Sequence, residues 1–174
     1  MKEKRGMKGS MHLLLGTAVG FTAASYLQAQ PEMQCAVIIP CMVGALYPDI
    51  DLPASTIGKR FKLLSVPLSR VLRHRGFIHT PLNMALTSIL LYFVMLKFAP
   101  AYAFVTAMSF TMGFGMHLLQ DMCTTRGIML LYPYKKFFAL THFDSKHWIH
   151  FFITILIYLI YFLLLVRFQC FRYF

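Results

Sequence analysis

Charged residues are scarce in this sequence. Of its 174 residues only 13% are Asp, Glu, Lys or Arg, whereas about a quarter are charged in a typical soluble domain. Hydrophobic residues make up 58% of the chain, and the mean hydropathy is +0.62. This composition excludes an ordinary soluble domain and predicts an integral membrane protein.

Paired cysteines are also missing. The four cysteines show no C-x-x-C spacing, which argues against a zinc ribbon, and we interpret them as small buried hydrophobic residues. Acidic residues number only 6 against 17 basic residues, so the net charge is +11. In a soluble protein this excess would suggest nucleic acid, but here the basic residues must first be compared with the apolar segments.

Five apolar runs divide the chain. The second is short and contains Pro40, and it spans a bilayer only if it is tilted or lengthened by its flanks. The first follows a basic segment and would also suit a secretory signal peptide, but its length and the further runs favour a membrane span. The sequence therefore predicts an all-α, polytopic membrane protein that forms a single domain over residues 1–174. The predicted transmembrane helices cover residues 11–29, 33–47, 77–98, 101–120 and 149–166.

The polar connections are expected to carry short interfacial helices. In residues 48–76, apolar side chains recur at helical spacing, which predicts a helix that lies in the membrane interface. These side chains are Phe61, Leu64, Leu68 and Leu72.

The basic residues predict the orientation. Residues 1–10, 48–76 and 121–148 contain 14 of the 17 Lys and Arg residues, and the positive-inside rule places these segments in the cytoplasm. Five spans then put the N-terminus in the cytoplasm and the C-terminus outside. This topology, in an inner membrane, accounts for the positive charge without a nucleic-acid partner.

Histidine and aspartate side chains gather at the cytoplasmic ends of the first four spans. Carboxylates at helix C-termini near a bilayer need a cation, and histidines at helix N-termini are favoured in the neutral form that binds a metal. Mixed His/Asp ligation suits one or two divalent ions, first zinc, with manganese or iron as alternatives. The candidate ligands are His12, Asp49, Asp51, His74, His79, His117 and Asp121.

Each of these residues also has a simpler interpretation. A single interfacial histidine is more often an amphipathic anchor, and Asp49-x-Asp51 could form a turn or pair with Arg73 or Arg75. The gathering of seven such residues at one membrane face favours the metal site. We interpret His142, His147 and His150 as interfacial residues near Trp148.

Several motifs in chain order resemble the YdjM-like family of membrane-bound metal-dependent hydrolases, some of which are described as LexA-regulated. The resemblance implies hydrolysis, by analogy of a phosphoester in a lipid-like substrate. Where such families usually carry a hydroxyl residue and a serine around the second histidine, this chain has Ile78 and Thr80. The matching motifs are His12, Leu46-Tyr47-Pro48-Asp49-Ile50-Asp51, Leu72 to Thr80, and His117-Leu118-Leu119-Gln120-Asp121 followed by Thr124, Gly127 and Tyr132-Pro133.

The expected chemistry is attack of an activated water on a phosphorus or acyl centre. Asp51 is the expected general base, and Arg75, followed by Arg126, would stabilise the developing oxyanion. The alternative is a metal-binding transporter or sensor without hydrolytic activity. A weak internal repeat supports it, because each predicted helical pair starts with a histidine, His12 or His79, and ends in an aspartate, Asp49 or Asp121. A third hypothesis is a structural membrane protein that binds a cytosolic partner through its basic loops.

Overall fold

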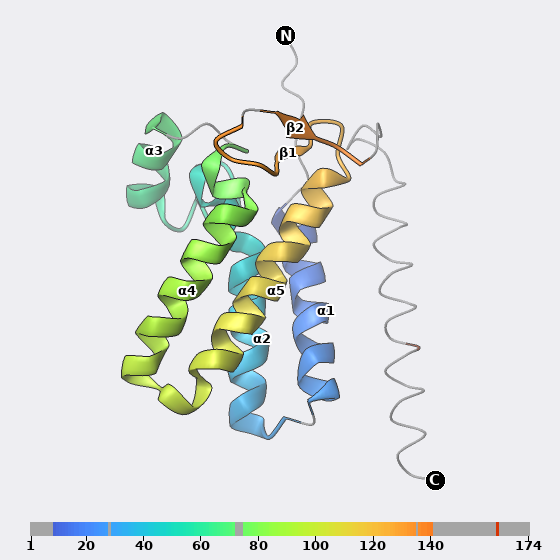
Figure 1. Cartoon of the computed structure of the whole chain (residues 1–174), viewed down its shortest axis with the longest axis vertical. Coiled ribbons are helices and arrows are strands. Elements are labelled where there is room, and N and C mark those ends of the chain that lie inside the picture. Colours follow the sequence, from blue (N-terminus) through green and yellow to red (C-terminus); the bar gives the residue numbers. More distant parts are fainter. Residues whose placement is uncertain (1–8, 28, 72–74, 135, 141–162, 164–174) are drawn as a thin grey trace.

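The computed structural model describes residues 9–27, 29–71, 75–134, 136–140 and 163. Four long helices run side by side through this part of the chain (Figure 1). Helix α5 packs against the other three, and α2 also packs against α1. The four helices are α1 (Gly9–Tyr26), α2 (Pro31–Leu46), α4 (Pro81–Phe98) and α5 (Ala103–Met122).

The shorter elements lie mostly at one end of this bundle (Figure 1). A 3-10 turn, η3 (Pro100–Tyr102), joins α4 to α5. The end of the bundle opposite η3 carries most of the shorter elements. These include α3 and a two-stranded antiparallel sheet, in which Ile128 pairs with Phe138 and Met129 with Phe137. The elements of that end are η1 (Tyr47–Asp51), α3 (Lys62–Val71), η2 (Phe77–His79), β1 (Ile128–Met129) and β2 (Phe137–Phe138).

Glycines bring α2 and α5 into direct backbone contact. A Cβ atom at Gly44 would overlap the carbonyl oxygen of Phe110, and one at Gly113 would overlap the carbonyl oxygen of Cys41. Small residues at a helix crossing let two backbones approach closely, which is how helices associate in a membrane. This contact holds η1, which continues directly from α2, against the C-terminal half of α5.

The start of α4 is set by a capping sequence. The hydroxyl oxygen of Thr80 accepts a hydrogen bond from the backbone N–H of Asn83 at 3.1 Å, and Pro81 occupies the first helical position. Both are favoured there, because the cap accepts from a free N–H and proline has none to leave unpaired. The helix therefore begins at Pro81, and the predicted start at residue 77 corresponds to η2, which holds His79 just before the helix.

Three of the described helical segments are long and apolar enough to cross a membrane: Pro31–Asp51, Pro81–Phe98 and Pro100–Met122. The uncertain second run gains its length from η1, and Pro40 is accommodated inside α2. The predicted first span is helical as α1, but it is not one of these three. The predicted span at 149–166 lies outside the described residues, apart from Leu163, so five spans are not confirmed.

The described chain is mostly helical, as expected, but in the described part of the second polar connection β1 and β2 form a small hairpin, where a short interfacial helix was expected. Gly127 has a φ of +62°, a conformation that glycine adopts without a steric cost. This turn brings Ile128 into the core cluster with Phe114 and Leu118. The helix predicted in the first connection is present as α3, and its position in the membrane interface stays a prediction.

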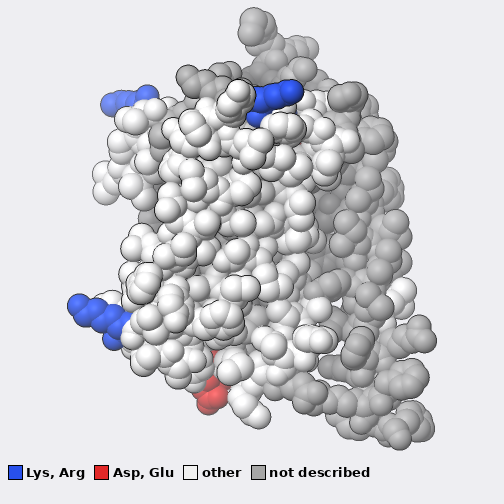
Figure 2. Space-filling model, viewed as in Figure 1, with Lys and Arg blue, Asp and Glu red and all other residues white. Residues whose placement is uncertain are grey.

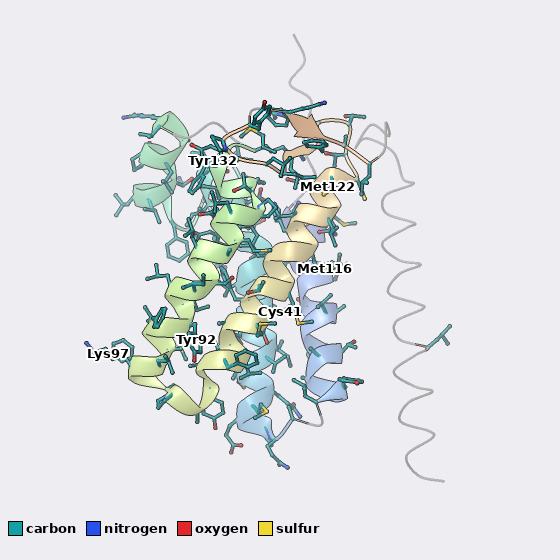
Figure 3. All side chains as sticks on the ribbon, viewed as in Figure 1. Cys41, Tyr92, Lys97, Met116, Met122 and Tyr132 are labelled. Carbon is teal, nitrogen blue, oxygen red and sulfur yellow. The ribbon has the colours of Figure 1, made fainter. Side chains whose placement is uncertain are left out.

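The surface agrees with a bilayer environment. Large apolar side chains of α4, including Leu90 and Phe93, are exposed over most of the helix length. In the face drawn in Figure 2, Lys, Arg, Asp and Glu lie towards the two ends and leave the middle uncharged. Lys97 marks the end opposite the hairpin (Figure 3). An uncharged middle on this face is what contact with lipid chains requires.

Candidate metal centre

The predicted His and Asp residues meet at the hairpin end of the bundle. His12 comes from the first turns of α1, Asp49 and Asp51 from η1, His79 from η2, and His117 and Asp121 from the last turns of α5. All six are buried. His74 lies outside the described residues.

Two histidines and two carboxylates face one another around a common point. His79 Nε2 and His117 Nε2 each lie 3.6 Å from Asp121 Oδ2. The same two nitrogens lie 3.8 and 3.9 Å from Asp49 Oδ1. His12 Nε2 lies 3.9 Å from Asp121 Oδ1, and its ring stacks on that of His117 at 3.8 Å.

Hydrogen bonds on the far side of two rings identify their tautomers. His117 Nδ1 lies 2.8 Å from the carbonyl oxygen of Ala45, and His12 Nδ1 lies 2.7 Å from Oε1 of Gln120. A carbonyl oxygen can only accept, so in both rings Nδ1 carries the hydrogen. In the neutral rings Nε2 therefore has a lone pair directed at the carboxylates. The Nε2 atom of His117 has no hydrogen-bond partner within the described part of the chain.

With neutral rings, the buried cluster brings hydrogen-bond acceptors face to face. Carboxylate oxygens and unprotonated imidazole nitrogens are all acceptors, so the neutral cluster lacks donors, and a cation between these atoms would satisfy it. Two ligand atoms that are each about 2.1 Å from a tetrahedral zinc ion lie roughly 3.4 Å apart, close to the distances here. Ligand atoms within 4.8 Å of one another form two overlapping triads, His12–Asp49–His117 and His79–His117–Asp121. The residues fit a divalent metal.

His79 is supported from its other ring nitrogen. Burial lowers the pKa of His79, because a charged ring is poorly solvated there, and the neutral form is the one that binds a metal. Its Nδ1 atom lies 3.7 Å from Asp51 Oδ2. Asp51 is therefore placed behind His79, in the position of a carboxylate that orients a ligand histidine.

Arg75 binds the second carboxylate oxygen of Asp121. Its Nη2 donates to Asp121 Oδ1 at 2.6 Å, and its Nη1 donates to the Thr124 hydroxyl at 2.6 Å and the Gly127 carbonyl at 3.4 Å. Asp121 is thus left with Oδ2 for the cluster. Arg75 itself has a φ of 62°, a strained conformation for a residue with a side chain, and such strain is typical of functional sites.

The outcome for the other candidates is mixed. Arg126 lies in an exposed position of the turn after α5, whereas Arg75 is buried. His142, His147 and His150 lie outside the described residues. Sequence reasoning assigned no role to Gln120, which orients His12, or to Thr124, which holds Arg75. A polar Gln120 in the last turn of an apolar run was the available signal, because burying an amide near a bilayer is costly without a partner.

Comparison with known proteins supports a shared family. The chain is 34% identical over 127 residues to the uncharacterized protein YvsG of Bacillus subtilis (strain 168), covering 73% of this chain and 74% of that protein. It is 36% identical over 106 residues to the inner membrane protein YdjM of Escherichia coli (strain K12) and to that of Shigella flexneri. These last matches cover 59% of this chain and 53% of each YdjM protein, so the chain spans about half their length. No solved structure matches it.

The family model described as YdjM inner membrane protein matches residues 7–172. That range includes every predicted metal ligand, the arginine that holds Asp121 and the glutamine that orients His12. The chain therefore belongs to the YdjM family of inner membrane proteins.

Proposed function

We propose that this protein is a membrane-bound, metal-dependent hydrolase that acts at the cytoplasmic leaflet. Its substrate would be a phosphoester or another ester of an amphiphilic, lipid-like molecule. The observation that carries the proposal is the Nε2 atom of His117, which is buried without a hydrogen-bond partner in the described chain and faces two carboxylates. Such a cluster supports metal binding.

His79, His117, Asp49 and Asp121 would hold one divalent ion, and His12 lies in reach as a further ligand. Zinc suits this His/Asp set best, with manganese or iron as alternatives. A bound ion of this kind lowers the pKa of water toward neutrality and polarises an ester or phosphoryl oxygen.

The remaining residues would position these groups. We assign Asp51 to orienting the His79 ring rather than to the general-base role expected from its D-x-D pattern. Asp49 would bind the ion through Oδ1, which faces the two histidines, and its second oxygen is the better general base, because the side chain is 9% exposed, against 3% for Asp121 and 0% for Asp51. An attacking water reaches the most exposed of the three most easily, and a base must lie within hydrogen-bond reach of it.

The Nε–H donor of Arg75 would be available to a substrate. Its Nε–H is buried without a hydrogen-bond partner in the described chain, although both Nη atoms are engaged. This supports the expected role of Arg75 in stabilising a developing oxyanion, in addition to positioning Asp121.

The leaflet follows from charge. The basic segments 1–10, 48–76 and 121–148 would lie in the cytoplasm under the positive-inside rule, with the N-terminus inside and the C-terminus outside. The metal cluster lies next to the second and third of these segments. An amphiphile in the inner leaflet would then present its polar group at the depth of the cluster.

The test is metal analysis together with hydrolysis assays. Full-length protein in detergent would be compared with His79→Ala, Asp121→Ala and Glu32→Ala, the last being an exposed carboxylate at the opposite end of α2. We expect near-stoichiometric zinc, manganese or iron in the wild type and in Glu32→Ala, and its loss in the two site variants. Hydrolysis of phosphoester or acyl lipids should be lost in the same two variants.

Two results would contradict the proposal. If the wild type binds no metal after supplementation, the cluster is held by protons, with an imidazolium at His117, and the hydrolase has no chemical basis. If metal binds and depends on His79 and Asp121, but no ester or phosphoester is cleaved, the protein is a metal-binding transporter or sensor.

A further inference from the structure

Helix α3 (Lys62–Val71) presents an apolar face that the protein leaves uncovered. Leu63, Pro67 and Val71 follow one another at intervals of four residues and form a stripe along the helix. Leu63 is 97% exposed and Val71 is 82% exposed. Just before the helix, Phe61 is also exposed. So much exposed apolar surface on a helix of ten residues needs a cover.

The opposite side of α3 is the side that the protein covers. Ser65 is the buried residue of the helix, and α3 packs against η1. Ser65 is two positions from both Leu63 and Pro67, which places it about 200° around the helix axis from each of them. The apolar stripe therefore faces away from the protein. Figure 1 shows α3 at the edge of the bundle, at the hairpin end.

Cations that pair with no carboxylate of the described residues border this stripe. Lys59, Arg60, Lys62 and Arg70 are all exposed, and residues 52–71 contain no Asp or Glu. In the described part of the chain, no carboxylate forms an ion pair with any of the four. Three of them stand at the N-terminal end of α3, where the helix dipole disfavours positive charge. They do not stabilise the isolated helix, so a negative surface outside the protein is their natural partner.

We propose that α3 and residues 59–62 form a binding surface for anionic phospholipids of the surrounding membrane. The Leu63–Pro67–Val71 stripe lies among the upper acyl chains, and the four cations contact phosphate groups of acidic lipids. The proposal does not depend on the metal centre. It predicts a lipid preference that a helix held in the interface by apolar contact alone would lack.

The experiment uses full-length protein in lipid nanodiscs. Leu63→Trp is introduced together with Trp148→Phe, so that the chain has one indole and it is on α3. Brominated phosphatidylglycerol and brominated phosphatidylcholine, which quench indole fluorescence on contact, are compared at equal mole fraction in a phosphatidylcholine background. We expect the anionic lipid to bind near the indole roughly fivefold more tightly or better, since one Lys or Arg near an anionic surface contributes about that factor.

Replacing all four cations by Gln should abolish this preference while leaving quenching by both lipids. The matched control is Lys97→Gln, an exposed cation at the opposite end of the bundle, which should leave the preference unchanged. Equal quenching by the two lipids in the parent protein would overturn the proposal. An indole that neither lipid quenches would also overturn it, and if its emission shifted with protein concentration, a second copy of the chain would be the cover.

Discussion

The two carboxylate oxygens of Asp121 face different partners. Its Oδ1 atom accepts a hydrogen bond from Arg75 Nη2 at 2.6 Å, and its Oδ2 atom faces His79 and His117 at 3.6 Å. Both Arg75 and Asp121 are almost completely buried. A buried ion pair of this kind is costly to break, because the remaining charge has no solvent. This ion pair links the turn at 75–80 to the end of α5 and leaves Oδ2 of Asp121 oriented towards the cluster.

Replacing Arg75 should therefore weaken metal binding. We choose Arg75→Gly because glycine tolerates the φ of 62°, so the variant removes the guanidinium without adding backbone strain. Loss of a group that orients a ligand typically reduces metal affinity by about 10- to 100-fold, and we expect a reduction in that range. The measurement is competition for zinc with a chelator of known affinity. Arg126→Ala, in an exposed position of the same region, should keep wild-type affinity, and an unchanged Arg75→Gly affinity would refute the positioning role.

Gln120 should matter through His12. Its Oε1 accepts from His12 Nδ1 at 2.7 Å, so Gln120→Leu frees the ring to rotate or change tautomer. We expect roughly tenfold weaker metal binding, the lower end of the effect of such supporting residues. Gln34→Leu is the matched control, because the side-chain amide of Gln34 is also hydrogen-bonded, as a donor to the backbone carbonyl of Ala29, but far from the cluster. Equal affinities in the two variants would show that His12 contributes nothing to the site.

Helix packing predicts opposite effects of two alanine substitutions in α5. Gly113→Ala would push a methyl group into the Cys41 carbonyl, and such overpacking costs about 1–3 kcal/mol. Gly115→Ala would meet only Met84 Sδ, at 3.8 Å, and the higher helix propensity of alanine favours it by up to about 1 kcal/mol. Thermal unfolding in detergent should show a lower Tm for Gly113→Ala and an unchanged or higher Tm for Gly115→Ala. The reverse order would be inconsistent with close α2–α5 contact.

Metal removal should destabilise the protein. An ion that binds the folded chain stabilises it by about 2.7 kcal/mol when its free concentration is about 100 times its Kd. In addition, the ion offsets the repulsion between the carboxylates of Asp49 and Asp121. Chelation should therefore lower the Tm of the wild type, and zinc should restore it. His117→Ala should not respond to either treatment, and an equal response in that variant would place the bound metal elsewhere.

Much of the architecture was accessible from composition and pattern. Apolar runs of spanning length must bury their backbone groups as helices in lipid, so the positions of α2, α4 and α5 followed from hydropathy. The spacing of Leu64 and Leu68 correctly predicted α3. The hairpin after α5 was not predicted, because strands of two residues have no detectable periodicity. Ile128 is buried through its contact with Phe114 and Leu118, a relation that no local pattern contains.

The sequence by itself determined which residue types stand at the ends of the apolar runs, and thus that His12, Asp49, His79, His117 and Asp121 share one membrane face. Only the tertiary structure decided their contacts. Asp51 and Asp49 are two positions apart and identical in type, yet one lies behind His79 and the other faces the cluster. Arg75 and Arg126 are both basic loop residues, yet only Arg75 reaches Asp121. These differences depend on distances of a few ångströms between elements that are far apart in the sequence. Helix packing sets those distances, and no local sequence pattern contains them.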